Sequence, residues 1–335
     1  MPRQMRLGHI LGWGMLLSEM VGCGVQHPTS FPSLPHIVAC YVLPHGTQGQ
    51  MTCRQYNAHG RPVGAAQSLG PLGLVAEAQV AGSWPGGFVV TTGRLIETVV
   101  NYHTREWVRV PRGWTILSVR RIHGRLWFVA ENLHHQQLRA GKALTAGHWS
   151  WARQPIPLGI TTLVRTANDL PAVAVMTPTS AQVIYLEGQK NLPPLVNVAP
   201  QGSVGFWSGA ALVPYAKGSS SFGVAKLTTH GIMRQRAPSV YRAVIEISDT
   251  NPPWGVTVRG MVPIQKGQGV FSHLVPWPHP MPGTMTIVGS GHPWILVVDG
   301  NSQGVWFNTQ TGHYGPRFQI NTPWRAVVRA IALGS

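Results

Sequence analysis

The stretch Thr115–Gly124, TILSVRRIHG, decides the fold, because its pattern returns along the chain. It is a short apolar segment with polar residues near its middle. Similar segments recur at a period of about 40–45 residues, which is typical of architectures built from one repeated supersecondary unit. The other six are GLVAEAQVAG (Gly73–Gly82), TTLVRTANDL (Thr161–Leu170), GSVGFWSGA (Gly202–Ala210), RAVIEISDTN (Arg242–Asn251), GTMTIVGSG (Gly283–Gly291) and RAVVRAIALG (Arg325–Gly334). Their lengths and β-branched residues predict seven short β-strands.

Each recurring segment is followed by further strand-like segments and turns. After Thr115–Gly124 come RLWFVAEN, HHQQLRAG and HWSWARQP. The 39 glycines and 28 prolines leave no stretch for a long helix. A 40–45-residue unit of several short strands predicts an all-β, seven-bladed β-propeller, with the recurring segments as the inner strands of its blades. Recurring tryptophans are then expected to pack between blades.

The two ends of the predicted domain complement each other. Trp324–Leu333 reads as an inner strand with nothing after it, whereas His36 begins what reads as a second strand without a first. We therefore predict a propeller over residues 36–335, closed by a C-terminal strand that completes the N-terminal blade and removes exposed sheet edges. This closure resembles the velcro closure of many propeller families.

The N-terminus has the features of a targeting segment. Two arginines precede Leu7–Gly22, a mostly apolar stretch that is short for a membrane span. It ends in Met20-Val21-Gly22-Cys23, which resembles the lipobox of bacterial lipoproteins, although leucine is usual where Met20 stands. The resemblance implies a signal peptide at 1–22, lipidation of Cys23 and a tether at 23–35. The alternatives are an ordinary secretory signal and an uncleaved anchor.

These features predict an extracytoplasmic protein that contacts the cell membrane only through its lipid anchor, or, alternatively, a secreted one. Cys40 and Cys53 agree with that location. The midpoint between them falls in the predicted turn His45–Gly49, so the two cysteines face each other in an antiparallel hairpin. We predict a disulfide between them, as an oxidising compartment permits. The alternative is two buried free thiols.

The scarcity and imbalance of charged residues allow two interpretations of the surface. Only 11% of residues are charged, and 26 basic against 10 acidic residues give a net charge of +16. One interpretation is a partner of opposite charge. The other is adaptation to acid, as in an acidophile, where surface carboxylates lose their charge. The basic residues are scattered without a run of five, so a nucleic-acid partner is not expected.

Alignment of the inner strands predicts a ring of charged residues along the central channel. Two interpretations remain open: an anion-binding ring, and a mutually neutralising structural ring. A register error of one residue would remove any member. The predicted members are Glu77, Arg120, Arg165, Glu246 and Arg329.

Catalytic signatures are scarce. Glu77 and Glu246 are the only plausible pair of catalytic carboxylates, and arginines offset both. Asp169, Asp249 and Asp299 fall at strand ends, where aspartate usually caps a turn. The histidines lack partners at metal-ligand spacing, so neither a metal nor a cofactor is expected.

The sequence therefore predicts a monomeric, cell-surface lipoprotein whose propeller serves binding or scaffolding rather than catalysis. Its partner could be a protein, a wall polymer or an anionic ligand, and the residues do not choose among them. The competing hypothesis is a hydrolase or lyase that uses the channel residues.

Overall fold

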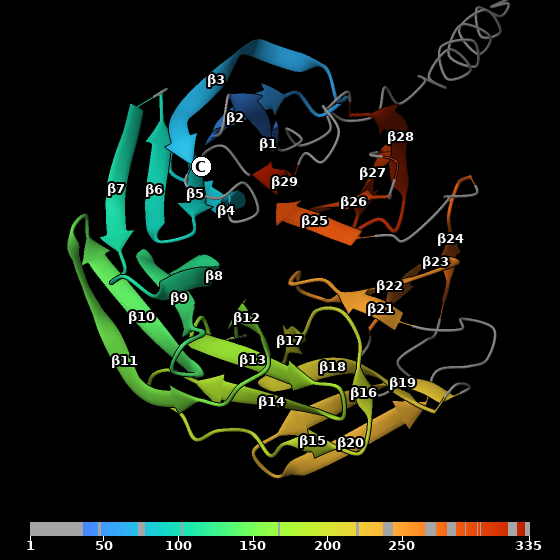
Figure 1. Ribbon diagram of the computed structural model, residues 1–335. Helices are drawn as coiled ribbons and strands as arrows, with labels where there is room; N and C mark the ends of the chain where they lie inside the picture. Colours follow the sequence, from blue (N-terminus) through green and yellow to red (C-terminus); the bar gives the residue numbers. More distant parts are fainter. Residues whose placement is uncertain are drawn as a thin grey trace, which may run out of the picture. The chain divides into compact units, whose positions relative to one another are not determined.

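The computed structural model describes a compact unit within Pro35–Ser335. The described residues are 36–45, 48–72, 78–101, 103–166, 168–218, 221–236, 244–264, 273–279, 286–291, 293–299, 301, 303–320 and 327–331. They form seven antiparallel sheets arranged as the blades of a β-propeller (Figure 1). The predicted fold class is confirmed.

The blades are numbered along the chain, and their strands are given from the innermost outward. Blade 1 contains β29 (Val327–Ile331), β1 (His36–His45), β2 (Gln48–Tyr56) and β3 (Pro62–Leu72). Blade 2 contains β4 (Ala78–Trp84), β5 (Gly87–Thr92), β6 (Leu95–Val100) and β7 (His103–Arg109). Blade 3 contains β8 (Trp114–Ile122), β9 (Arg125–Asn132), β10 (Gln137–Thr145) and β11 (His148–Ile156). Blade 4 contains β12 (Ile160–Arg165), β13 (Pro171–Thr177), β14 (Ser180–Tyr185) and β15 (Leu195–Val196).

Blades 5 to 7 follow the same plan. Blade 5 contains β17 (Gly205–Trp207), β18 (Ala210–Lys217), β19 (Ser221–Thr228) and β20 (Gly231–Arg236), with β16 (Ala199–Pro200) also paired to β18. Blade 6 contains β21 (Val244–Ile247), β22 (Trp254–Thr257), β23 (Gly260–Pro263) and β24 (Val275–Pro276). Blade 7 contains β25 (Thr286–Gly291), β26 (Trp294–Val298), β27 (Gln303–Asn308) and β28 (Tyr314–Gln319).

The C-terminal strand closes the ring as predicted. β29 pairs with β1, from His36 opposite Ile331 to Cys40 opposite Val327. It also contacts β25 of blade 7 and β4 of blade 2. In the same blade a disulfide joins Cys40 to Cys53, which face each other in the β1–β2 register. The predicted disulfide is confirmed, and its Cys40 lies in the β1–β29 pairing that closes the ring.

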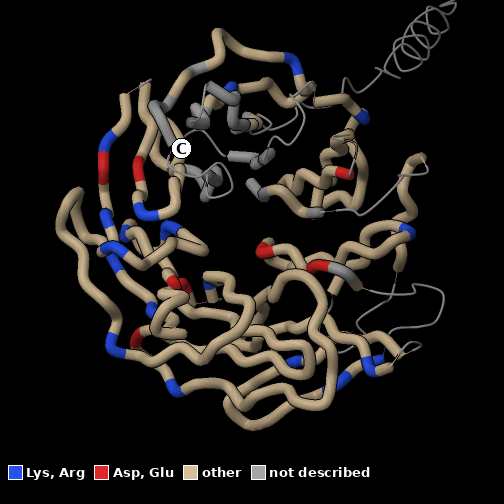
Figure 2. The backbone as a smooth tube through the Cα atoms, in the orientation of Figure 1, with Lys and Arg blue, Asp and Glu red and all other residues tan. Residues whose placement is uncertain are grey.

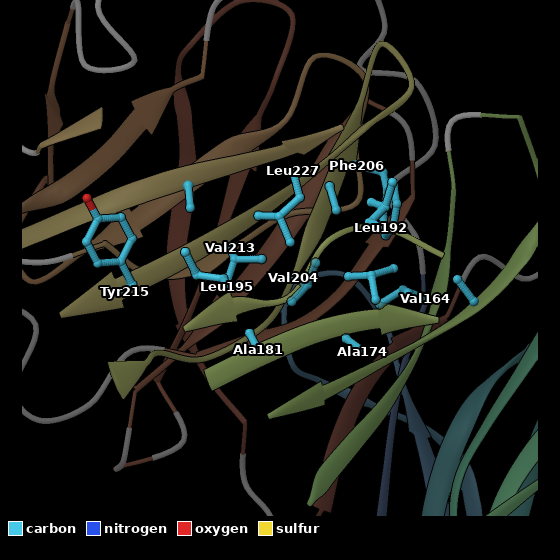
Figure 3. Close-up of a cluster of buried hydrophobic side chains, with 14 of the residues drawn as sticks. Val164, Ala174, Ala181, Leu192, Leu195, Val204, Phe206, Val213, Tyr215 and Leu227 are labelled. Atoms are coloured by element: carbon cyan, nitrogen blue, oxygen red, sulfur yellow. The ribbon is translucent and has the colours of Figure 1, made fainter. Parts of the chain in front are cut away.

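Apolar side chains fill the space between neighbouring blades. Figure 3 shows the cluster between blades 4 and 5, where Val164 and Ala174 of one blade and Phe206 and Val213 of the other are all buried. Similar clusters lie between blades 2 and 3, 3 and 4, 5 and 6, and 6 and 7. Because the second strands are covered on both sides, they read as continuous apolar runs.

Four inner strands share an irregularity that the sequence does not reveal. In β4, β8, β21 and β25 the pairing with the next strand shifts by one residue. Each shift is a β-bulge, which turns the following side chains relative to the sheet. The bulged residues are Ala81, Leu117, Ile245 and Val288. Ser118 and Glu246 therefore occupy equivalent positions, which corrects the alignment of Arg120 with Glu246.

The ring has two faces, which the turns distinguish. The face that carries the turns between inner and second strands, such as His123–Gly124, is also where β1 begins, so we call it the entry face. Turns between second and third strands, such as Leu133–Gln136, lie on the opposite face. Among the described residues, none forms a helix with the length and apolar character needed to cross a membrane.

Candidate functional site

An ion pair crosses the axis of the ring near the entry face. Arg120, near the end of β8 in blade 3, donates from its guanidinium to Oδ2 of Asp249, which follows β21 in blade 6. Blades 4 and 5 separate the two residues along the ring. Their side chains are 30% and 37% exposed, so water screens the pair and its contribution to stability is below about 1 kcal/mol.

A second charged group lies in the turn after β12. Arg165 donates from Nε to Oδ1 of Asp169, and Nδ1 of His123 lies 4.0 Å from the other oxygen of that carboxylate. Arg165, which the sequence places in the channel ring, is thus bonded within its own turn. Asp249 and Asp169, expected only to cap turns, are the partners of the two arginines.

Glu246 links two blades. Its Oε2 accepts the backbone N–H of Ile287, in the inner strand of the next blade. The equivalent Ser118 does the same: its Oγ accepts the backbone N–H of Leu163 at 3.2 Å. Ser203 Oγ joins blades 5 and 6 by donating to the carbonyl of Ile247 at 3.1 Å. A polar residue in or just before an apolar inner strand therefore supplies the inter-blade hydrogen bonds that the strand edges require.

For three predicted site residues, all or part of the residue lies outside the part of the chain that the structure describes. Glu77 and Cys23 lie outside the described residues. Arg329 is placed by its backbone alone, opposite Val38 in the β29–β1 pairing. The lipidation of Cys23 and a complete channel ring therefore stay predictions. Within the described ranges no three His, Cys, Asp or Glu side chains are grouped as metal ligands.

A pocket on the outer part of blade 3 was not predicted. The pairing of β10 with β11 shifts from Arg139 opposite Pro155 to Gly141 opposite Trp151, so that β11 carries two extra residues. This bulge leaves a cavity of about 480 Å³. We call it the blade-3 pocket, and its lining is Gln136–Arg139 and Ala152–Ile156.

Packing around Gly141 holds the edge of this pocket. A Cβ at Gly141 would lie 2.2 Å from the ring of Phe128, so the close approach requires glycine. Phe128 packs in turn against Trp149 and Trp151, with centroids 5.4 and 5.6 Å away. The guanidinium of Arg139 lies 5.7 Å from the ring of Trp114, a cation–π contact. The tryptophans thus serve packing, as predicted, and one of them also positions a basic side chain of the pocket.

Most carboxylates of the described residues have bonded partners, whereas several basic groups do not. Four carboxylates pair with basic side chains, and two accept backbone N–H groups, which makes six of the ten acidic residues. These are Glu106, Asp169, Glu187 and Asp249, followed by Glu246 and Asp299. By contrast, Arg112, Arg139 and Arg153 are exposed and form no ion pair among the described residues. Figure 2 shows Lys and Arg distributed around the outside of the ring.

Glu97 and Glu106 are a carboxylate pair that the sequence analysis did not single out. They are directly opposite each other in β6 and β7 of blade 2. Partial burial and the neighbouring Glu106 raise the pKa of Glu97, and Arg109, which donates to Glu106, opposes that rise. The pair lies away from the ring axis, in the outer half of its blade.

Comparisons with known proteins identify the architecture but no family. No family model matches the chain, and no curated protein does. Among solved structures, Sqt1 of Saccharomyces cerevisiae has a TM-score of 0.51 at 10% identity and covers 86% of each chain. Apo AztD from Citrobacter koseri has 0.46 at 9%, covering 89% of this chain and 98% of that one. A protein of unknown function from Bacteroides caccae has 0.45 at 12%, covering 89% and 99%. At such identities only the fold is shared.

Proposed function

We propose that this protein is an exported, lipid-anchored binding propeller that holds anionic polymer of the cell envelope on its basic outer surface. The observation that carries the proposal is that carboxylates have bonded partners whereas several exposed arginines do not, within the described part of the chain. Six carboxylates are bonded within the fold, while exposed arginines of blade 3 have no carboxylate partner among the described residues. Exposed arginines without a carboxylate partner attract polyanions.

The blade-3 pocket is the place where we expect the polymer to bind most closely. It combines two arginines with three glutamines and lacks any acidic lining residue. Arginine recognises carboxylate and phosphate groups with two parallel hydrogen bonds, and glutamine amides suit the hydroxyl groups of a sugar or polyol chain. The pocket is bounded by the turn Leu133–Gln136, on the face opposite the entry face.

Arg120 and Glu246 are less suited to either binding or hydrolysis. Arg120 is neutralised by Asp249, and Glu246 accepts a backbone hydrogen bond that joins two blades. These contacts support the structural interpretation of the described part of the channel ring, and they favour binding on the outer surface over catalysis at the axis.

The test measures binding of the purified protein to polyphosphate, with neutral dextran as the comparison polymer. We expect binding to polyphosphate at about 0.1 M salt and its loss at about 1 M, since the screening length falls from about 10 Å to about 3 Å. The variant Arg139→Gln/Arg153→Gln should bind at least about tenfold more weakly, a loss of two charge-assisted contacts. The matched control Arg234→Gln/Arg236→Gln removes two exposed arginines of blade 5 and should change affinity little. Equal losses in both variants would disprove the pocket, and salt-insensitive or absent binding would disprove the function.

The anchor is tested separately. Cells producing the full-length protein are labelled with radioactive palmitate, and Cys23→Ser is compared with the native chain. We expect label and detergent partitioning in the native protein only. Label retained in the variant would place the lipid on another residue. An unlabelled native protein would disprove the lipid anchor and favour an ordinary secretory signal or an uncleaved anchor.

A further inference from the structure

Asp299 directly follows β26 and caps the turn that leads into β27 of blade 7. Its Oδ1 accepts the backbone N–H groups of Asn301 at 2.8 Å and Gln303 at 2.9 Å, and its own N–H donates to the carbonyl of Gln303 at 3.0 Å. Turn capping, which the sequence predicts for this aspartate, therefore needs only one carboxylate oxygen.

The other oxygen has no such role. Asp299 is only 5% exposed, and its Oδ2 is buried with no hydrogen-bond donor in the described part of the chain. Gln303 Oε1 is buried without a donor from the described residues as well. Among the described residues, no Lys, Arg or His pairs with Asp299. Buried charges in proteins are paired or coordinate a metal, so an unpartnered carboxylate oxygen points to a missing ligand.

The hairpin places Asp299 and Gln303 opposite each other. The last pair of the β26–β27 ladder is Val298 opposite Gly304, so Asp299 and Gln303 face each other at the next position. Side chains of directly opposed residues lie on the same face of a sheet, with Cβ atoms about 5 Å apart. Two acceptors without a donor repel each other in isolation and are satisfied together by a cation.

We propose that Asp299 Oδ2 and Gln303 Oε1 are ligands of a calcium ion in the β26–β27 turn. Carboxylate and amide oxygens are the hard ligands that Ca²⁺ prefers, and water and backbone carbonyls complete its shell. Asp299, Asn301 and Gln303 stand at alternate positions, as the first ligands of calcium-binding loops do. With a single carboxylate the expected dissociation constant is about 10⁻³ M, in the range of extracellular calcium modules.

The first measurement is thermal unfolding of the purified full-length protein with and without calcium. At about 10 mM Ca²⁺, tenfold above the expected dissociation constant, mass action should raise the folding equilibrium constant by a factor of about 11. Mg²⁺ should act more weakly, because it resists losing its waters. Terbium, which occupies calcium sites, should luminesce on excitation of Trp294 and Trp306, which lie in β26 and β27.

Two variants test the ligands in opposite directions. Asp299→Asn keeps Oδ1 as the turn cap and should abolish the calcium response and the terbium signal. Gln303→Glu adds a second carboxylate and should tighten calcium binding by about tenfold; it also tests the site should Asp299→Asn fail to fold. The matched control Glu106→Gln removes an exposed carboxylate of blade 2 and should leave the response unchanged.

Several outcomes would overturn the site. One is an unchanged melting temperature in calcium together with the absence of sensitised terbium, which would mean that a water molecule or a rotated Gln303 amide satisfies both oxygens. Another is a calcium response that persists in Asp299→Asn. A third is an equal response in all variants to calcium and to sodium at matched ionic strength.

Discussion

Polar side chains of the inner strands are bonded within the fold, whereas arginines on the outer rim of blade 3 are not paired with carboxylates in the part of the chain that the structure describes. In the inner strands, Ser118 and Glu246 each accept a backbone N–H from the next blade and so join one blade to the next. On the outer rim, Arg139 and Arg153 border a pocket and form no ion pair among the described residues. The polar groups that hold the ring together thus lie in the inner strands, and those that can hold a ligand lie on the outer part of the blade.

The difference follows from what each position faces. An inner strand has an edge of backbone groups near the axis, and a buried N–H that lacks a partner costs about 1–3 kcal/mol. A polar side chain after the β-bulge meets that need. The outer rim has no such demand, because water satisfies its backbone and side-chain groups. Substitutions in the two regions should therefore separate stability from binding.

The largest expected effect is that of Glu246→Ala. It removes a charge-assisted acceptor from the N–H of Ile287, and we expect the free energy of unfolding to fall by about 2 kcal/mol. Ser118→Ala, at the equivalent position in blade 3, should cost about 1 kcal/mol because its hydrogen bond is neutral. Denaturant unfolding measures both, and Glu106→Ala is the exposed control.

A binding measurement on the same variant separates its effect on stability from any effect on ligand affinity. Polyphosphate affinity should stay unchanged in Glu246→Ala under conditions where the variant is folded. A stable Glu246→Ala variant with lost binding would reverse the assignment and return Glu246 to a ligand site at the axis.

The sequence was sufficient for the architecture because its signals are local and repeated. The seven inner strands, the closure by Val327–Ile331 and the pairing of Cys40 with Cys53 follow from a period, a turn and the two chain ends. Each of these depends on residues that are neighbours in the chain or on the repeat itself. Fold class and closure could therefore be predicted without coordinates.

The contacts of the charged residues could not be predicted in this way. Arg120 meets Asp249, which lies 129 positions away. The repeat places these residues in blades 3 and 6, but it does not indicate that their side chains meet across the ring. The bulge at Leu117 shifts the register by one residue, and such an insertion leaves the hydrophobic period almost unchanged. The blade-3 pocket has the same origin, since two extra residues in β11 are visible only once the pairing with β10 is known.

A smaller effect is expected for the ion pair across the axis. Arg120→Ala, Asp249→Ala and the double variant form a cycle whose coupling energy should be below about 1 kcal/mol, because both side chains are partly exposed. Polyphosphate binding by the single variants should match that of the native protein. If Arg120→Ala lost as much affinity as Arg139→Gln/Arg153→Gln, the axis would take part in anion binding, and the division between inner strands and outer rim would fail.

The smallest expected effect concerns Glu97, which lies neither in an inner strand nor on the outer rim of blade 3. Its pKa in the folded protein is raised above the ordinary value of 4.5 by partial burial and by Glu106 across the strand pair. Below pH 4 the residue is protonated in both states and costs nothing. As the pH rises through 4.5 and then through the higher folded pKa, the folded state must accept a charge that the unfolded chain accepts more easily, so stability falls.

Glu97→Gln should remove this pH dependence. We expect a gain of about 0.5 kcal/mol near pH 7, the usual size of a screened like-charge pair, and no gain near pH 3. Chemical denaturation at the two pH values measures the difference, with Glu187→Gln as a control that instead breaks ion pairs to Lys142 and Arg125. A variant that gains equally at both pH values would locate the effect in packing. A gain confined to neutral pH would mean that this carboxylate pair suits the protein to an acidic medium, as the scarcity of acidic residues predicts.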